Sequence, residues 1–222
     1  MKALIFDVFG TLIKVEKGNS AKSIMANIAK ATGAVINEEG FLSEWRSFYA
    51  SHANSGDSFM SERDIFIARI EMFYKKYEVQ RDAEADYQSV FAGAYKRDAY
   101  EDVLPALNRM RTKYRIILGS NTDNDVLDAV LSKNGIITDG VYTSESLKCY
   151  KPDIEFFNAI LEAEHLKPHE VLFIGDNPRD DIKGPKQVGI KTVFIDRNSD
   201  SGDYGQTCTI HDLSELAQLL GV

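Results

Sequence analysis

Four short apolar runs, each leading into a small or acidic residue, constrain the fold of this chain more than any other feature. None of them alternates between apolar and polar residues, and such uninterrupted runs are typical of parallel strands buried on both faces. The runs cover residues 3–7, 114–118, 171–174 and 191–195, and they lead into Asp7, Gly119-Ser120, Gly175-Asp176 and Asp196. The sequence therefore predicts parallel strands whose carboxyl ends carry polar groups.

Helices are predicted between these strands, over residues 102–113, 122–133, 152–164 and 181–188, and a last one over 212–220. Thr122 is placed to cap the second of these helices. Strands that alternate with helices predict an α/β, doubly wound parallel sheet, in which ligands bind beyond the carboxyl ends of the strands. We therefore expect Asp7, Ser120 and Asp176 to meet at one edge of the sheet.

Residues 16–96 contain no strand signal and form too long a connection for an ordinary crossover. The segment predicts about four helices, with Asn37 and Ser61 as caps of the second and third. Four residues at helical spacing predict a packed face on the third helix: Phe66, Ile70, Phe73 and Tyr77. We expect an all-helical subdomain inserted into a core made of residues 1–15 and 97–222.

Charge and composition argue against several kinds of partner. The formal net charge is −8 with no basic stripe to offset it, which argues against nucleic acid. No stretch approaches the ~20 apolar residues of a membrane span and no signal-peptide core is visible, so no membrane association and a cytoplasmic location are expected. Cys149 and Cys208 are expected to be free thiols. We expect a monomer or homodimer that captures a small anionic metabolite through local groups.

The acids at the strand ends predict a cation site. If the loops converge, the carboxylates of Asp7, Asp176 and Asp181 form a cluster of like charges, which is costly unless a cation offsets it. Lys151 stands at the start of a predicted helix, and Asp180 competes with Asp181 for the third place in the cluster. Hard divalent ions prefer oxygen ligands, which favours Mg²⁺.

Four motifs in order resemble those of the haloacid dehalogenase-like superfamily of hydrolases. Together they span most of the chain and are much more specific than any one of them. The motifs are Asp7-Val8-Phe9-Gly10-Thr11, Ser120-Asn121, Lys151-Pro152, and Gly175-Asp176 with Asp181. The resemblance implies a Rossmann-like core, with the inserted helices as a four-helix cap over it.

The resemblance also implies catalytic roles. Asp7 would attack the substrate and form a covalent aspartyl intermediate, which water then hydrolyses. Thr11 and Ser120 would hydrogen-bond the carboxylate or the transferred group. Lys151 would keep Asp7 ionised and balance charge in the transition state.

Further residues are implied as ligands. The Gly10 backbone and Asn121 are expected to contact the substrate. In phosphatase members Mg²⁺ is bound by the nucleophile, by a backbone carbonyl two residues later and by the acid of the fourth motif. The implied metal ligands here are Asp7, the carbonyl of Phe9, Asp176 and, more weakly, Asp181, which would act through water or anchor the lysine.

Phe9 departs from the phosphatases of this superfamily, which usually carry a second Asp there to protonate the leaving alcohol. Phenylalanine cannot donate a proton, and general acid catalysis is typically worth about 10²–10⁴-fold. An aromatic residue at this position resembles the 2-haloacid dehalogenases, whose halide leaves without a proton. Arg46, which follows Trp45, resembles the cap arginine that receives the halide and the substrate carboxylate in those enzymes. The alternative is an amphipathic helix that buries Trp45 and leaves Arg46 in solvent.

Asp176 favours the phosphatases instead. Metal-free dehalogenases typically carry a Ser-Ser-Asn type of sequence there, and an acid beside Asp7 without a metal would blunt the nucleophile. We therefore favour a Mg²⁺-dependent phosphatase that acts on a small phosphorylated metabolite. Two alternatives stay open: a metal-independent 2-haloacid dehalogenase, and a binding protein that kept the fold with little turnover.

Overall fold

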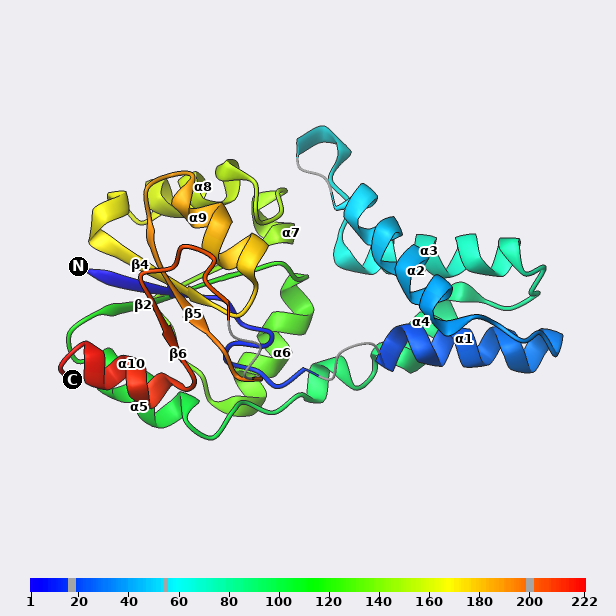
Figure 1. Cartoon of the computed structure of the whole chain (residues 1–222), viewed down its shortest axis with the longest axis horizontal. Coiled ribbons are helices and arrows are strands. Elements are labelled where there is room, and N and C mark those ends of the chain that lie inside the picture. The colour runs from blue at the N-terminus through cyan, green and yellow to red at the C-terminus, as the bar shows by residue number, and fades with distance from the viewer. Residues whose placement is uncertain (16–18, 54–55, 199–201) are drawn as a thin grey trace.

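The computed structural model describes residues 1–15, 19–53, 56–198 and 202–222 (Figure 1). Its central feature is a six-stranded sheet with the order β3-β2-β1-β4-β5-β6, and every pairing in it is parallel. The strands are β1 (Ala3–Phe6), β2 (Arg115–Ser120), β3 (Gly140–Thr143), β4 (Val171–Gly175), β5 (Lys191–Ile195) and β6 (Cys208–Ile210). The predicted parallel α/β sheet is confirmed.

Each of the four apolar runs forms a strand, whereas β3 and β6 at the two edges of the sheet were not predicted. Both edge strands are short and only partly buried, with a single buried residue each, Thr143 and Ile210. An edge strand pairs on one side only and needs no continuous apolar run. The hydrophobic pattern on which the prediction rests is therefore absent from them.

Helices cover both faces of the sheet, which makes it doubly wound (Figure 1). One face packs against α5 (Val103–Met110), α6 (Asn124–Asn134) and α10 (Leu213–Leu219), through apolar residues such as Leu107, Leu127 and Leu216. The other face packs against α8 (Ile154–Ala163), whose Phe156 and Ile160 lie beside Ile5 and Phe173; the short helices α7 (Ser144–Leu147) and α9 (Gly184–Lys186) flank it. We call this part of the molecule the α/β core.

The inserted segment forms a second cluster of helices with its own hydrophobic centre (Figure 1). It consists of α1 (Asn19–Thr32), α2 (Glu38–His52), α3 (Glu62–Lys76) and α4 (Ala83–Phe91), and we call it the helical unit. Asn37 and Ser61 cap α2 and α3 as predicted. Three residues of the predicted stripe, Phe66, Ile70 and Phe73, are buried in this cluster, and Tyr77 packs at its margin. The exact limits, 16–96, stay a prediction.

Two helix starts differ from the prediction. α6 begins at Asn124, and Thr122 does not cap it. The side chain of Asp123, the residue before α6, instead accepts hydrogen bonds from the backbone N–H groups of Glu62 (2.9 Å) and Arg63 (2.8 Å) at the start of α3. A carboxylate of the α/β core thereby caps a helix of the helical unit. No local sequence pattern encodes this long-range cap.

α8 begins at Ile154, two residues later than expected, after Asp153.

The segment predicted as a helix over 181–188 also differs. It begins earlier, as a single π-helical turn (Pro178–Lys183, η4), and continues into α9. Single-turn π-helices are frequent at functional sites. This one carries Asp180 and Asp181, at the carboxyl end of β4.

Both cysteines are free thiols, as expected, with Cys149 buried and Cys208 partly exposed. Among the described residues, none of the helices combines the length and the apolar character that a bilayer crossing requires.

Candidate active site

Three neighbouring strands bring the predicted polar residues to one edge of the sheet. Phe6, the last residue of β1, lies beside Leu118 of β2 and Ile174 of β4. Asp7 follows directly, while Ser120 ends β2 and Asp176 follows β4. The three side chains therefore leave the sheet at nearly the same level, as the carboxyl-end rule requires.

A buried lysine joins two carboxylates at this edge. The Nζ atom of Lys151 lies 2.8 Å from Oδ1 of Asp7 and 2.7 Å from Oδ1 of Asp181. Lys151 and Asp181 are 4% and 1% exposed. Ser120 Oγ donates a long hydrogen bond, 3.5 Å, to the same Oδ1 of Asp7. Asp181, rather than Asp180, is the acid that holds the lysine.

Burial and charge oppose each other in this group. Burial alone would lower the pKa of Lys151, but the attraction of Asp181 and Asp7 outweighs it, so the pKa of the lysine lies above its usual value. Burial also raises the pKa of Asp181 well above its usual value, although the charge of Lys151 opposes that rise. Two carboxylates thus compete for one ammonium group.

Asn121 holds the lysine in place. Its Oδ1 accepts a hydrogen bond from the backbone N–H of Lys151 (2.8 Å), and its Nδ2 donates to the carbonyl of the same residue (3.0 Å). This reciprocal pair fixes the backbone from which the ammonium group reaches Asp7. The predicted substrate contact of Asn121 stays a prediction, although the residue does line the cavity described below.

Two glycines let the acids approach the backbone. Gly10 has φ +96°, and a Cβ atom there would lie 2.4 Å from Oδ2 of Asp176. At Gly175 a Cβ atom would lie 2.3 Å from the carboxylate of Asp181. Neither glycine can carry a side chain without moving an acid of the site. Thr11, which is fully buried, donates to Oδ1 of Asp176 at 3.4 Å.

Replacing Gly10 with alanine tests this close approach. Gly10→Ala is expected to displace Asp176 and to lower hydrolase activity about 10–100-fold, the usual cost of disturbing a group that orients a site. Gly33→Ala is the matched control, because Gly33 also has a positive φ (+72°) but no atom of the described residues lies within 4 Å of the position of its Cβ. Gly33→Ala should lose only the stability that the strained φ costs, Gly10→Ala should lose at least as much, and only Gly10→Ala should lose activity. Equal activities would contradict the assigned role of Gly10.

The arrangement of acids fits a divalent metal ion. Carboxylate oxygens of Asp7, Asp176 and Asp181 lie within 4.8 Å of one another. Hard cations prefer such oxygen ligands. Both oxygens of Asp181 already accept hydrogen bonds, from Lys151 and from the backbone N–H of Asn177. Asp7 and Asp176 are therefore the better direct ligands, and Asp181 suits an outer position.

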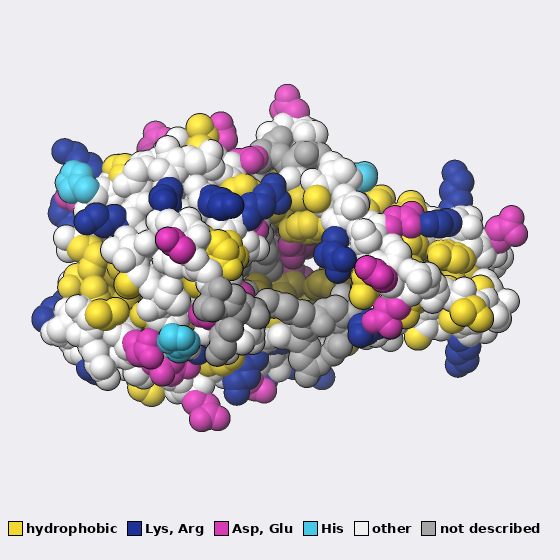
Figure 2. Space-filling model, viewed as in Figure 1, with side chains coloured by type: hydrophobic (Ala, Val, Ile, Leu, Met, Phe, Trp, Pro, Cys, Tyr) yellow, Lys and Arg dark blue, Asp and Glu magenta, His cyan; other side chains and the backbone are white. Residues whose placement is uncertain are grey.

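A cavity of about 430 Å³ lies over these acids. The α/β core lines it with residues that include Asp7, Phe9 and Lys151, and the helical unit contributes Tyr49 and Glu62. Figure 2 shows the corresponding hollow between the two parts of the molecule, with acidic side chains visible in its depth. Neither Tyr49 nor Glu62 was predicted as a site residue.

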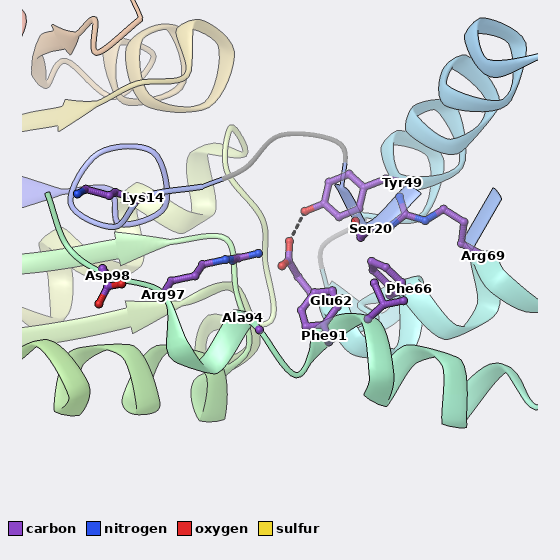
Figure 3. A pocket seen from close by; sticks show the side chains of 12 residues that line it. Lys14, Ser20, Tyr49, Glu62, Phe66, Arg69, Phe91, Ala94, Arg97 and Asp98 are labelled. Carbon is purple, nitrogen blue, oxygen red and sulfur yellow. Dashed lines mark hydrogen bonds between the residues drawn. The ribbon is translucent and has the colours of Figure 1, made fainter. Parts of the chain in front are cut away.

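A second cavity, of about 590 Å³, adjoins the first and shares Tyr49 and Glu62 with it (Figure 3). Lys14, Arg69 and Arg97 also line it. Arg69 is only 6% exposed, and no group of the described residues forms a hydrogen bond with its Nε atom. Its guanidinium group stacks on the ring of Trp45, with 3.8 Å between the Cζ atom and the centroid of the ring, and this contact stabilises the buried charge.

Arg46, the predicted cap arginine, does not line either cavity. It lies exposed on α2, because the preceding residue Trp45 is buried in the helical unit. Successive residues of a helix point in directions about 100° apart, so burial of one turns the next away. A substrate-binding role for Arg46 stays a prediction without support from this geometry.

A family model described as haloacid dehalogenase-like hydrolase matches residues 1–189. The chain belongs to the haloacid dehalogenase-like hydrolases. Its four ordered motifs are the residues that meet at the edge of the sheet.

Similar proteins within this hydrolase family have two kinds of activity in their names. The (S)-2-haloacid dehalogenase 4A of Burkholderia cepacia is 25% identical over 224 residues, which cover 99% of this chain and 93% of that protein. The glyceraldehyde 3-phosphate phosphatase of Methanopyrus kandleri is 26% identical over 207 residues, which cover 89% of this chain and 84% of that phosphatase. The solved L-2-haloacid dehalogenase RSc1362 superimposes with a TM-score of 0.76 at 19% identity, over 100% of this chain and 99% of that one. This structural likeness confirms the fold.

Proposed function

We propose that this hydrolase is a Mg²⁺-dependent phosphatase that acts on small phosphorylated metabolites. The observation that supports the proposal is the cluster of Asp7, Asp176 and Asp181, in which Asp7 and Asp181 are buried and paired with Lys151 and Asp176 is partly exposed. Three carboxylates and one lysine leave an excess of negative charge in this largely buried place, where a divalent cation would offset it. A metal-free dehalogenase has no evident use for Asp176.

The residues of the chain fit covalent catalysis by Asp7. Lys151 and Ser120 both contact Oδ1, which leaves Oδ2 to attack phosphorus. Water then cleaves the phosphoaspartate and releases phosphate. When bound by Asp7, Asp176 and the carbonyl of Phe9, Mg²⁺ would offset the charge of the phosphoryl oxygens. Lys151 adds a fixed positive charge beside Asp7.

The basic side chains of the second cavity support the proposal that the substrate is a small anion. Lys14, Arg69 and Arg97 line it, and Asp98, which also lines it, is paired with Lys133. These local cations would attract an anion although the chain as a whole carries a charge of −8.

A 2-haloacid dehalogenase is the second candidate, and two observations favour it. Phe9 removes the usual acid of the phosphatases, which halide release does not need. The Burkholderia dehalogenase matches 99% of this chain, against 89% for the Methanopyrus phosphatase. In this candidate Asp7 would displace halide from carbon and form an ester, which water would cleave without a metal.

Metal removal separates the two candidates. Phosphate release from a panel of phosphate monoesters should stop in EDTA and return with excess Mg²⁺. Asp176→Asn should weaken Mg²⁺ binding by calorimetry at least tenfold, as expected on losing a direct ligand. Asp180→Asn is the comparison, because Asp180 lies in the turn that follows Asp176 but outside the three-acid cluster, and this variant should still bind Mg²⁺.

Other outcomes would overturn the proposal. Halide release from 2-chloropropionate that persists in EDTA, without phosphatase activity, would establish the dehalogenase instead. Tight ligand binding without turnover of either substrate class would favour a binding protein.

A further inference from the structure

Phe9 leaves the proposed phosphatase without its usual proton donor in the core, and Glu62 of the helical unit faces the same cavity. Glu62 lines the cavity above Asp7 together with Phe9. It also lines the adjoining cavity, so it stands where the leaving group of a substrate would pass from one to the other. Apart from the predicted metal ligands, of which Asp181 is also engaged with Lys151, Asp180 is the other carboxylate that lines the first cavity.

Glu62 belongs to the helical unit, but contacts with the core hold it in place. Asp123 of the core accepts a hydrogen bond from its backbone N–H at 2.9 Å. Two residues earlier, the carbonyl of Met60 accepts from the hydroxyl of Tyr150 at 2.8 Å. Asp123 lies shortly after Ser120, and Tyr150 directly precedes Lys151. The first turn of α3 is thus attached to the two loops that carry the catalytic groups.

A hydrogen bond from α2 orients the carboxyl group of Glu62. The hydroxyl of Tyr49 on α2 donates to its Oε1 at 2.6 Å, as the dashed line in Figure 3 shows. The side chain of Arg97 points toward the same carboxyl group in that view. With Oε1 occupied by Tyr49, Oε2 is the atom that can exchange a proton with a substrate.

The surroundings of Glu62 suit proton transfer near neutral pH. Burial raises the pKa of Glu62 to about 7, and the charge of Asp123 adds to the rise. The hydrogen bond from Tyr49 and the charges of Arg69 and Arg97 oppose it. A general acid is most effective when its pKa lies near the working pH.

We propose that Glu62 is the general acid and base of this enzyme, supplied by the helical unit in place of the acid missing at Phe9. The inference rests on the proposed phosphatase function. As Asp7 attacks phosphorus and the bond to the leaving oxygen breaks, the proton of Glu62 passes to that oxygen and an alcohol departs. The resulting carboxylate then takes a proton from the water that attacks the phosphoaspartate, so Asp7, phosphate and protonated Glu62 are restored.

The dependence on leaving group tests the proposal. Glu62→Gln should lower kcat about 10²-fold or more on alkyl phosphates, whose alkoxide needs a proton. It should change kcat little on p-nitrophenyl phosphate, whose phenolate leaves without one. Glu71→Gln, an exposed glutamate on the same helix, is the control and should match the wild type on both substrates.

Two further measurements do not depend on the glutamine variant. In the wild type, alkyl phosphatase activity should fall as pH rises through about 7, because the acid must be protonated. Tyr49→Phe removes a hydrogen bond that favours the ionised carboxylate, so it should move this fall to higher pH. Infrared titration of the metal-free protein should show a carboxylic acid band that titrates near pH 7 and is missing in Glu62→Gln, in addition to the band of Asp181, whose pKa is also raised and which both proteins keep.

Each outcome decides a different claim. If the wild type releases phosphate but Glu62→Gln slows alkyl and aryl substrates equally, Glu62 is structural and this inference is wrong, while the phosphatase proposal stands. If Tyr49→Phe leaves the pH profile unmoved, the inference is also wrong. If the wild type releases no phosphate from either substrate, the phosphatase proposal and this inference fail together.

Discussion

Asp7→Asn is expected to abolish hydrolysis of whichever substrate class the enzyme accepts, with a loss of about 10³-fold or more. An amide oxygen is a much weaker nucleophile than a carboxylate, and loss of a covalent nucleophile typically costs this much or more. Phosphate release and halide release are both measured. After rapid quenching, mass spectrometry should find a covalent adduct on the wild-type peptide that contains Asp7, and none on the variant.

The fold should survive this change. Lys151 keeps its ion pair with Asp181 at 2.7 Å, and one of two competing buried carboxylates is removed. The melting temperature should therefore stay close to that of the wild type. Asp128→Asn, an exposed aspartate on α6, controls for the substitution itself. Wild-type turnover by Asp7→Asn would end both enzymatic candidates, because each of them depends on this carboxylate.

The catalytic edge was predictable because strand ends are regular. Continuous apolar runs identified β1, β2 and β4, and parallel pairing brings their carboxyl ends together whatever the loops do. Asp7, Ser120 and Asp176 therefore meet as expected. The motif pattern also placed Lys151, although only the fold shows that Asn121 holds its backbone.

The contribution of the helical unit was not predictable from local patterns. A glutamate in the first turn of a helix normally serves the helix itself, so Glu62 carried no functional signal. Its place in the cavity depends on Asp123 and Tyr150, which are distant in sequence. The sequence did not indicate a role for Arg69 either, because this residue lies on the apolar face of α3, where its guanidinium group stacks on Trp45.

Asp176 and Phe9 suit different reactions, and a proton donor at Glu62 would allow both residues to serve one enzyme. Asp176 suits a metal-dependent phosphoryl transfer, whereas Phe9 suits a leaving group that needs no proton. A proton donor on the helical unit would make this combination serve a phosphatase. It would also make proton transfer sensitive to the attachment of α3 to the core, because Asp123 holds the same turn.

Replacing Lys151 with methionine should have the second large effect, on activity and on stability together. Removing one buried, charged donor at the reacting group typically costs about 10²–10³-fold in kcat. The change also leaves the buried carboxylates of Asp7 and Asp181 without their cation, and breaking a buried ion pair in this way costs about 3–5 kcal/mol of unfolding free energy. Urea unfolding and steady-state assays measure the two losses.

The loss of stability should depend on pH with a definite sign. Burial already raises the pKa of Asp181 in the wild type, and Lys151 opposes the rise, so without the lysine this pKa moves further up. A carboxyl group with a raised pKa in the folded state contributes its stability at low pH and loses it as pH rises through that value. Lys151→Met should therefore be closest to the wild type near pH 4, the usual carboxyl range, and should weaken steadily toward neutrality.

Two further variants identify the cause of that weakening. Lys183→Met removes an exposed lysine from the turn that carries Asp181 and should leave the pH profile of stability unchanged. Asp181→Asn added to Lys151→Met removes one of the uncompensated charges, so it should restore stability at neutral pH but not activity. If the double variant were no more stable than Lys151→Met, the loss would not come from the uncompensated charge of Asp181, and the contact of the Lys151 ammonium with the ring of Phe173, 5.3 Å from Nζ to the ring centroid, would be the next cause to test.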